Sequence, residues 1–260
     1  MWLKACVNGS RRPGEHPGVP VDPAALARES AAAVGAGARA VHLHARDAEG
    51  AESLQALDVA ACVTAVRAAV PGVPVGVSTG LWVTAGDADR RAADLEGWGE
   101  LPAASRPDFA SVNLGEEGAA SVWHRLGALG IGVEPGIWTP PDLDVLARLR
   151  PAVAETSRGS GDAVVRVLLE VLDAAPGQER TRAAALLAAA RDAGLDDALL
   201  LLHGEGAAAW PVLVLAAAEG LQGRIGLEDV LEGPLGEPVT GNADLVRAAL
   251  ALASPTGGGS

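Results

Sequence analysis

The sequence predicts an α/β protein that folds as a single (β/α)8 barrel, and three observations lead to this expectation. Short β-rich runs alternate strictly with Ala-, Leu- and Arg-rich stretches of helical length, which is the pattern of a parallel sheet. The strand and helix pairs number eight along the sequence, and eight such pairs close a barrel. The chain has 260 residues, of which 49% are hydrophobic, and this is enough for one large core.

The expected elements follow one another in strict alternation. Strands are expected at residues 3–8, 40–45, 73–78, 109–114, 130–134, 164–171, 198–203 and 223–227. Helices are expected at residues 23–36, 54–69, 87–97, 118–129, 141–150, 179–193, 206–219 and 241–253. The alternative is an open doubly wound sheet, which the absence of a GxGxxG motif after the first strand disfavours.

Helix starts and the end of the domain can also be placed. Asp22 followed by Pro23 is a typical helix start. Further helix N-caps are expected at Ser53, Asp142 and Asn242. The barrel domain is expected to span residues 1–253 and to be followed by a flexible tail at 254–260, because SPTGGGS has the composition of a flexible end.

Composition excludes several classes of function. The net charge of −13 argues against a general nucleic-acid or anionic-membrane surface, since both need a basic face. No run reaches the roughly 18 apolar residues of a membrane span, and no signal pattern opens the chain, so a cytoplasmic location is expected. Cys6 and Cys62 have no metal spacing and are interpreted as buried thiols. Lys4 is the sole lysine and tyrosine is absent, so carbonyl activation must come from arginine, histidine, backbone or metal.

Polar residues occupy the ends of the expected strands, although the strand bodies are apolar. In barrel enzymes the chemistry lies at the C-terminal ends of the strands. Each of these residues alone could simply form local hydrogen bonds, but together they point toward one rim. They are Asn8, His42, His44, Ser78, Asn113, Glu134, His203, Glu228 and Asp229.

The HLH motif indicates a metal site. His42 and His44 lie two residues apart on a strand, so their side chains share one face. In a closed barrel the eighth strand lies two away from the second, with the first between them, so Glu228 can reach the layer of His44. Two imidazoles and one carboxylate with an open position form a typical catalytic zinc site. Two purely structural histidines remain the alternative.

The RIGLED motif adds a candidate acid–base pair. Arg224, Gly226 and Glu228 share parity, so Arg224 should point inward with Glu228, and Gly226 leaves room for a ligand or for the two long side chains. Asp229 could be a general base held ready by Arg224. An ordinary structural salt bridge is the other interpretation.

The motifs HLHARD, STG and RIGLED, in this order, resemble the β-keto acid cleavage enzyme family, which includes 3-keto-5-aminohexanoate cleavage enzyme. The resemblance runs from residue 4 to about residue 253. It implies a (β/α)8 barrel with Zn²⁺, a homo-oligomer that is often a tetramer, and a reaction of a β-keto acid with acetyl-CoA. The products would be acetoacetate and a new acyl-CoA.

The resemblance also implies a role for individual residues. The zinc ligands would be His42, His44 and Glu228. The catalytic residues would be the base Asp229, its partner Arg224, and Ser78. The substrate-binding residues would be Ser78, Thr79, Gly80, Ser111, Asn113 and Glu134.

Two positions depart from the family pattern and bear on the side chain of the substrate. Glu205 stands where many relatives have an apolar residue, and Ser10 stands where the aminohexanoate enzyme has an acid. Two other functions stay open on the sequence. One is a metal-dependent barrel hydrolase that needs no CoA, and the other is a barrel that only binds or assembles.

Overall fold

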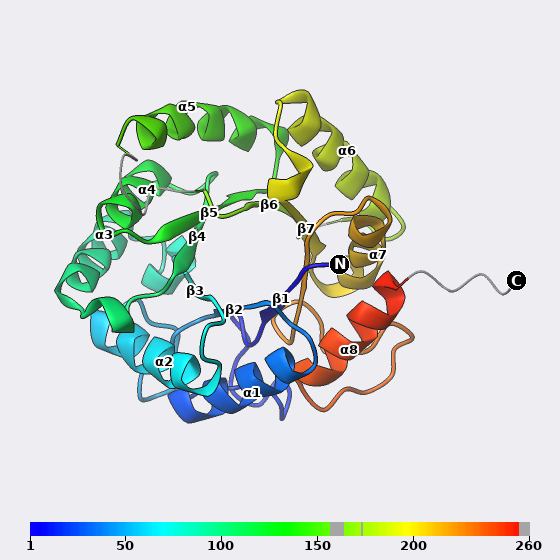
Figure 1. Cartoon of the computed structure of the whole chain (residues 1–260), viewed down its shortest axis with the longest axis horizontal. Helices are drawn as coiled ribbons and strands as arrows, with labels where there is room; N and C mark the ends of the chain where they lie inside the picture. Colours follow the sequence, from blue (N-terminus) through cyan, green and yellow to red (C-terminus); the bar gives the residue numbers. More distant parts are fainter. Residues whose placement is uncertain (157–163, 173, 255–260) are drawn as a thin grey trace, which may run out of the picture.

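Eight parallel strands form a closed ring in the computed structural model, which describes residues 1–156, 164–172 and 174–254 (Figure 1). The strands are hydrogen-bonded in the order β7-β6-β5-β4-β3-β2-β1-β8. A parallel bridge between Leu201 and Gln222 joins β7 to the segment before β8 and closes the ring. The strands are β1 (Leu3–Cys6), β2 (Ala40–Leu43), β3 (Val75–Ser78), β4 (Phe109–Asn113), β5 (Gly132–Ile137), β6 (Val167–Val171), β7 (Leu200–Gly204) and β8 (Gly223–Ile225).

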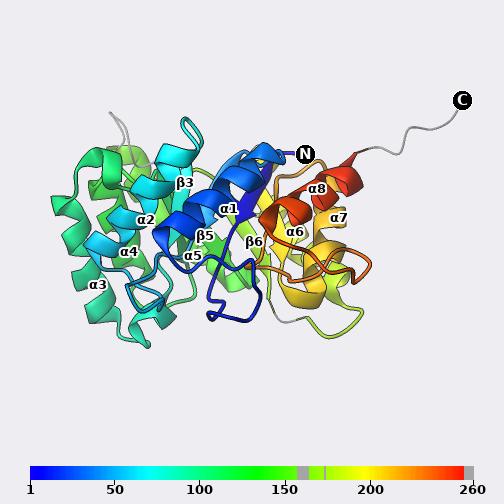
Figure 2. The same cartoon turned by 90° about the horizontal axis from the view of Figure 1, so that it is seen from below.

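Helices surround this ring on all sides, as Figures 1 and 2 show. They are α1 (Pro23–Gly35), α2 (Ala56–Ala69), α3 (Ala88–Gly97), α4 (Ala119–Ala128), α5 (Pro140–Thr156), α6 (Glu179–Asp192), α7 (Ala209–Ala218) and α8 (Asn242–Ala253). The apolar side chains between strands and helices form one buried core, which stabilises the ring through the burial of apolar surface. The predicted single-domain barrel is confirmed, and the open doubly wound sheet is wrong because β1 lies between β2 and β8.

Six strands end at other residues than predicted: β1, β2, β4 and β8 end one or two residues early, and β5 and β7 end later. β5 continues to Ile137, past the expected end at residue 134, because β4 continues beside it and pairs Asn113 with Gly136. β8 ends at Ile225 instead of residue 227. Glu134 therefore lies within a strand, whereas Glu228 lies in the loop after one. Of the expected tail at 254–260, only Ser254 falls among the described residues.

The expected helix caps have mixed outcomes. Asp22 caps α1, since its carboxylate accepts a hydrogen bond from the Ala25 amide at 2.8 Å. The prediction for Ser53 is wrong because Gln55 is the cap residue of α2.

Asn242 is the first residue of α8 and not its cap. Its side chain instead accepts from the Leu227 amide and donates to the Val7 carbonyl, so it ties α8 to the loops after β8 and β1. Asp142 lies in the first turn of α5 and accepts from the preceding backbone amides of Trp138 and Thr139.

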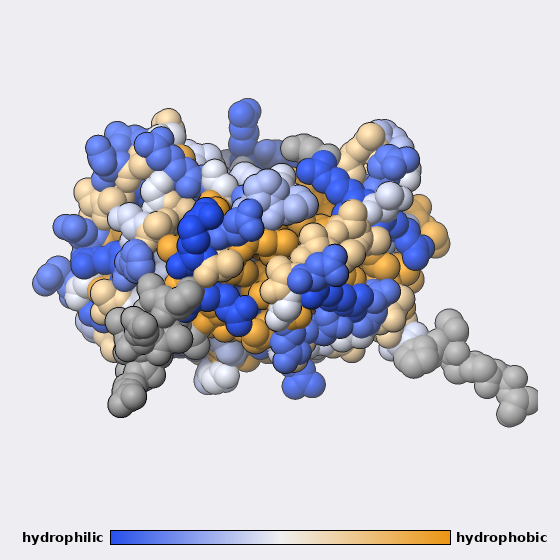
Figure 3. Space-filling model, turned by 90° about the horizontal axis from the view of Figure 1, so that it is seen from above, coloured by the Kyte–Doolittle hydropathy of each residue, from blue (hydrophilic) through white to orange (hydrophobic). Residues whose placement is uncertain are grey.

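None of the helices described is long and apolar enough to cross a bilayer. Hydrophobic residues do gather in the middle of the side that carries α5 and α6, between hydrophilic residues (Figure 3).

Gly226 has a packing role that the sequence did not indicate. A Cβ atom at this position would lie 1.9 Å from the carbonyl oxygen of Cys6, so the absent side chain lets the backbone after β8 pack against β1. The expected role of Gly226 in making room for a ligand is wrong for this reason.

We expect Gly226→Ala to destabilise the protein by about 1–3 kcal/mol, because a side chain there must displace backbone. Gly35→Ala is the matched control, since a Cβ at Gly35 meets nothing within 4 Å. Urea unfolding of both variants measures the difference. Equal stability of Gly226→Ala and the wild type would contradict the close approach of β8 to β1.

Candidate active site

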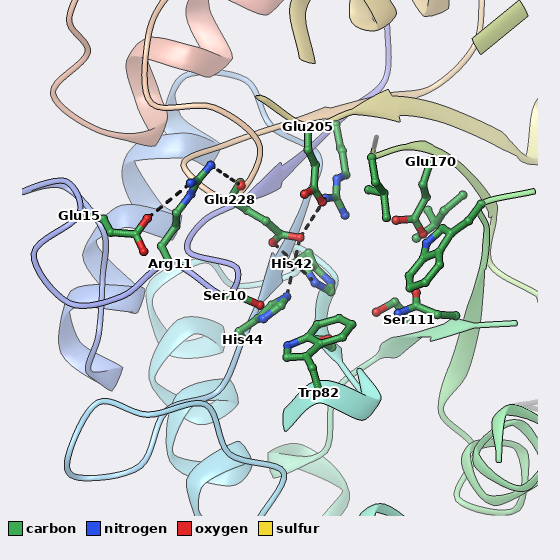
Figure 4. Close-up of a pocket in the computed structure, with 16 residues that line it drawn as sticks. Ser10, Arg11, Glu15, His42, His44, Trp82, Ser111, Glu170, Glu205 and Glu228 are labelled. Carbon is green, nitrogen blue, oxygen red and sulfur yellow. Dashed lines mark hydrogen bonds and ion pairs between the residues drawn. The ribbon is translucent and has the colours of Figure 1, made fainter. Parts of the chain in front are cut away.

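A cavity of about 390 Å³ opens at the C-terminal ends of the strands. Its lining comes from most of the barrel, so residues far apart in sequence face one space. Figure 4 shows Glu228, His42 and His44 together on one side and Glu170 across the cavity from them. The polar lining residues include Ser10, Arg11, Glu15, His42, His44, Ser78, Ser111, Asn113, Glu170, Glu205, Arg224 and Glu228.

His42, His44 and Glu228 form a cluster that can bind a metal ion. Their nearest ligand atoms all lie within 4.8 Å of one another. Nε2 of His42 is 3.8 Å from Oε2 of Glu228, and Nε2 of His44 is 3.7 Å from Oε1. Two ligands of one tetrahedral zinc ion lie roughly 3.3–3.5 Å apart, so small adjustments suffice. Burial lowers the pKa of His42 well below its ordinary value, which keeps the ring neutral, as a metal ligand must be.

The buried oxygen of Glu228 supports a ligand role. Oε2 of Glu228 is buried and accepts no hydrogen bond from the described residues, although an unpaired buried acceptor is costly. Burial would raise the pKa of Glu228, but the charge of Arg224 lowers it well below its ordinary value. The carboxylate is therefore ionised and has an oxygen available, and the donor set fits a divalent cation.

Glu52 orients one of the candidate ligands. Its Oε1 lies 2.5 Å from Nδ1 of His44. Because an ionised carboxylate only accepts hydrogen bonds, this contact places the ring proton on Nδ1 and leaves Nε2 free toward Glu228. Burial alone would raise the pKa of Glu52, but its hydrogen bond with His44 lowers it. Such a partner of a metal-binding imidazole raises its affinity for the metal.

Other contacts fix the position of His44. Trp82 stacks on the imidazole with ring centroids 6.0 Å apart, and its indole N–H donates to Glu52. Gly80 makes this possible, since a Cβ there would overlap the Trp82 ring at 2.2 Å. Asn8 exchanges two hydrogen bonds of 2.8 Å with the backbone of His44. The histidine is thus held through both its ring and its backbone.

Arg224 connects the metal cluster to Asp229. Its guanidinium is buried, and Nη2 lies 2.7 Å from Asp229, 2.9 Å from Glu228 and 3.2 Å from Glu205. The structure also places Glu205, Glu228 and Asp229 within metal-binding distance of one another. Arg224 supplies positive charge to all three carboxylates.

Asp229 has the properties of a base in a protected position. The residue is 0% exposed and lies behind the cavity wall formed by Arg224 and Glu228. Burial raises the pKa of Asp229 to about 8, although the charge of Arg224 opposes this shift. Its Oδ1 accepts both hydrogen bonds from Arg224, whereas Oδ2 is buried with no partner in the described chain. A carboxylate with a free oxygen and a pKa near neutrality suits proton abstraction.

Strands β6 and β7 and the residue after β7 carry a second group of ionisable residues. Glu170 of β6 pairs in register with His203 of β7, so both side chains lie on the inner face of the ring. Burial raises the pKa of Glu170 to about 7, and burial also raises the pKa of Glu205 to about 7. Glu52 and Glu170 are site residues that the sequence patterns missed. Glu170 is the next-to-last residue of β6, as His203 is of β7, and this shared position was the available signal.

The remaining expected substrate-binding residues have different outcomes. Ser78, Ser111 and Asn113 line the cavity. Thr79 lies behind the lining and donates to the Ser111 carbonyl at 2.6 Å, and Gly80 accommodates the ring of Trp82.

Glu134 is not brought to the cavity. It is fully buried inside β5, where it forms ion pairs with Lys4, at 2.5 Å, and with Arg166. Its predicted position at a strand end failed because the strand continues past Pro135. Glu134 pairs with two buried cations in the barrel interior, and this structural role replaces the expected contact with substrate.

Comparison with known proteins decides the family. The model of the family described as beta-keto acid cleavage enzyme matches residues 1–258. The chain belongs to this family. It is therefore an enzyme of the β-keto acid cleavage family, and its barrel carries a cluster that could hold a metal at the mouth.

Solved structures agree with the fold. The binary complex of ObcA with oxaloacetate has a TM-score of 0.67 and 16% identity, and the match covers 90% of this chain and 63% of that chain. The ternary complex of ObcA with a C4-CoA adduct and oxalate has a TM-score of 0.66 and 17% identity, with the same coverage. A truncated 3-deoxy-D-arabino-heptulosonate 7-phosphate synthase from Thermotoga maritima has a TM-score of 0.54 and 11% identity, covering 97% and 86%.

At these identities the likeness concerns the barrel fold alone. The chain also spans only about 63% of the length of ObcA.

We expect Glu52→Gln to weaken Zn²⁺ binding roughly 10–100-fold, because the carboxylate that fixes the His44 tautomer is lost. Competition with a chromophoric chelator measures the affinity. Glu49→Gln is the control, since Glu49 is exposed on the same loop. Unchanged affinity in Glu52→Gln would show that Glu52 does not support a metal ligand.

We expect Glu170→Gln to stabilise the protein more at pH 8 than at pH 4. The pKa of Glu170 is about 7 in the folded state against 4.5 for an ordinary glutamate. Between pH 4.5 and about pH 7, Glu170 is protonated in the folded chain and ionised in the unfolded chain. The contribution of Glu170 to the free energy of unfolding therefore falls as pH rises.

The full difference amounts to about 3 kcal/mol. Thermal or urea unfolding across this pH range measures it, with the exposed Glu96→Gln as control. A stability difference between Glu170→Gln and the wild type that does not change with pH would contradict the buried, protonated state of Glu170.

Proposed function

We propose that the protein is a zinc-dependent β-keto acid cleavage enzyme that condenses a 3-keto acid with acetyl-CoA and releases acetoacetate and a new acyl-CoA. The observation that carries this proposal is the position of Asp229. Its Oδ2 has no partner in the described chain, and Asp229 lies within metal-binding distance of Glu228, a member of the His₂Glu cluster that lines the cavity. A base beside a site for a Lewis acid suits the removal of a proton next to a carbonyl group.

The metal ligands proposed are His42, His44 and Glu228. When bound there, zinc would supply Lewis-acid polarisation of the 3-keto oxygen. Family membership supports this chemistry, and so does the fit of the donor set.

The residues of the chain then have separate tasks. The Ser78, Ser111 and Asn113 side chains on β3 and β4 would bind the substrate carboxylate through their hydroxyl and amide hydrogens. Oδ2 of Asp229 takes a proton from the carbon between the keto group and the carboxylate, while Arg224 holds Oδ1. The resulting carbanion attacks the thioester carbonyl of acetyl-CoA and expels the CoA thiolate.

The second half of the reaction is the reverse of a condensation at the original ketone. The CoA thiolate adds to the ketone carbon, and the bond between this carbon and the carbon that lost the proton breaks. The acyl group leaves as the new acyl-CoA, and acetoacetate takes its proton back from Asp229. The atoms balance without another co-reactant, and Asp229 ends the cycle as it began. One of the ObcA structures is a complex with a C4-CoA adduct, which is in keeping with acetyl-CoA as the co-substrate proposed here.

A homo-oligomer, with a tetramer as the expected form, and a cytoplasmic location belong to the same proposal. Glu170 and Glu205 both line the cavity. In this proposal the region around these two residues determines which keto-acid side chain is accepted.

Incubation of the zinc-loaded protein with acetyl-CoA and a panel of 3-keto acids tests the proposal. We expect acetoacetate, detected by coupled NADH oxidation, and the matching acyl-CoA, detected by mass spectrometry. Asp229→Asn should lower kcat roughly 10²–10⁴-fold, because the shape remains and the base is lost. Asp89→Asn, on the exposed surface of α3, should leave kcat unchanged. Turnover without acetyl-CoA would instead indicate a metal-dependent hydrolase, and no acetoacetate from any acid would overturn the proposal.

A further inference from the structure

His203 is a buried histidine that the proposed reaction does not use. It lies on β7, is 1% exposed, and neither ring nitrogen has a hydrogen-bond partner within the described residues. An unpaired buried polar atom costs about 1–3 kcal/mol. The neighbouring strand residues Leu200, Leu201 and Leu202 are all apolar, so an apolar side chain would pack here without that cost.

Two carboxyl groups face the ring of His203 from opposite sides. Nε2 lies 3.4 Å from Oε2 of Glu170, and Nδ1 lies 4.0 Å from Oδ1 of Asp229. Catalytic hydrogen bonds are often long without substrate and shorten in the substrate complex. The ring therefore stands between a group on the cavity wall and the proposed base behind it.

The charges of these groups define a direction for the contacts. Burial lowers the pKa of His203 well below its ordinary value, so the ring is neutral and has one donor and one acceptor. Burial keeps Glu170 protonated up to a pH of about 7, so its carboxyl group can donate to Nε2. Oδ1 of Asp229 accepts hydrogen bonds from Arg224, so the ring nitrogen that faces Oδ1 must be the donor. The ring proton then lies on Nδ1.

A contact of Nδ1 with Oδ1 would decide which oxygen of Asp229 is free. Oδ1 already accepts from Nε and Nη2 of Arg224, at 3.0 and 2.7 Å. Arg224 also serves Glu228 and Glu205, so it alone does not fix the rotation of this carboxylate. A donor on the rigid β7 strand approaches Oδ1 from a second direction and leaves Oδ2 with no protein partner.

We propose that His203 is a positioning residue for Asp229, which it holds at Oδ1 through Nδ1 while Glu170 holds its Nε2. The free Oδ2 is thereby aimed at the proton to be removed. This inference rests on the proposed function.

Three substitutions of His203 distinguish the contact at Nδ1 from the contact at Nε2. His203→Leu removes both polar atoms. His203→Asn keeps a donor near the position of Nδ1, and His203→Gln places its amide near the position of Nε2. His124→Gln is the control, because His124 is exposed on α4. Each variant is assayed for kcat, for KM of the keto acid, and for deuterium exchange at the carbon next to the keto group in D₂O without acetyl-CoA.

We expect kcat and the exchange rate to fall together, roughly 100-fold, in His203→Leu and His203→Gln, because misplacement of a base by about 1 Å has this effect. KM should stay within about two-fold, since substrate binding is not affected. His203→Asn should recover most of the lost rate. Wild-type kcat in His203→Leu, or a change confined to KM, would overturn the inference while leaving the proposed function in place.

A spectroscopic measurement on the wild type tests the protonation of the ring directly. Two-dimensional NMR of histidine-labelled protein reports which ring nitrogen carries the proton, and the His203 signal is assigned by its absence in His203→Gln. We expect a neutral ring protonated on Nδ1. Protonation on Nε2 would overturn the inference, and a wild type that forms no acetoacetate would remove both the proposed function and the inference that rests on it.

Discussion

The buried guanidinium of Arg224 is the interaction on which the mouth of the barrel depends. It is 4% exposed and lies within 3.2 Å of three carboxylates. Buried carboxylates without a counter-charge would be strongly destabilising, so Arg224 allows Glu228 and Asp229 to stand side by side. One of these faces the histidines and the other is held behind the cavity. A candidate metal ligand and a candidate base are therefore positioned by a single cation.

The barrel topology makes this arrangement possible. β1 lies between β2 and β8, so the histidines and Glu228 approach each other across the end of one strand. The loop after β1 contacts both His44 and Glu228. Asn8 binds the backbone of His44, and Gly9 leaves space for the side chain of Glu228. A Cβ at Gly9 would lie 2.4 Å from Cγ of Glu228, and its φ of +55° also favours glycine. The metal cluster is thus built around the backbone of β1.

Much of the fold could be predicted because its signals are local. Alternation of β-rich and helical segments indicates a parallel ring, and the two-residue period of a strand places His42 and His44 on one face. The same period predicted that Arg224 points inward with Glu228, although β8 ends at Ile225 and Glu228 reaches the cavity from the loop after it. These signals depend only on chain spacing, and the structure brings all four side chains to the cavity.

The parts that could not be predicted depend on contacts between distant segments. Glu52 contacts His44 because the loop after β2 folds back on itself, and an antiparallel bridge between Arg46 and Glu52 holds this fold. The pairing of Glu170 with His203 depends on the register between β6 and β7. Glu134 was misplaced because the end of β5 is set by its neighbour β4 and not by Pro135.

X-ray absorption at the zinc edge of the purified protein tests the central claim most directly, because it reports the atoms around the ion without reference to any substrate. The account predicts one zinc per chain with two imidazole nitrogens and carboxylate oxygen at about 2.0–2.1 Å. A spectrum with sulfur ligands, or a protein that takes up no zinc after reconstitution, would contradict it.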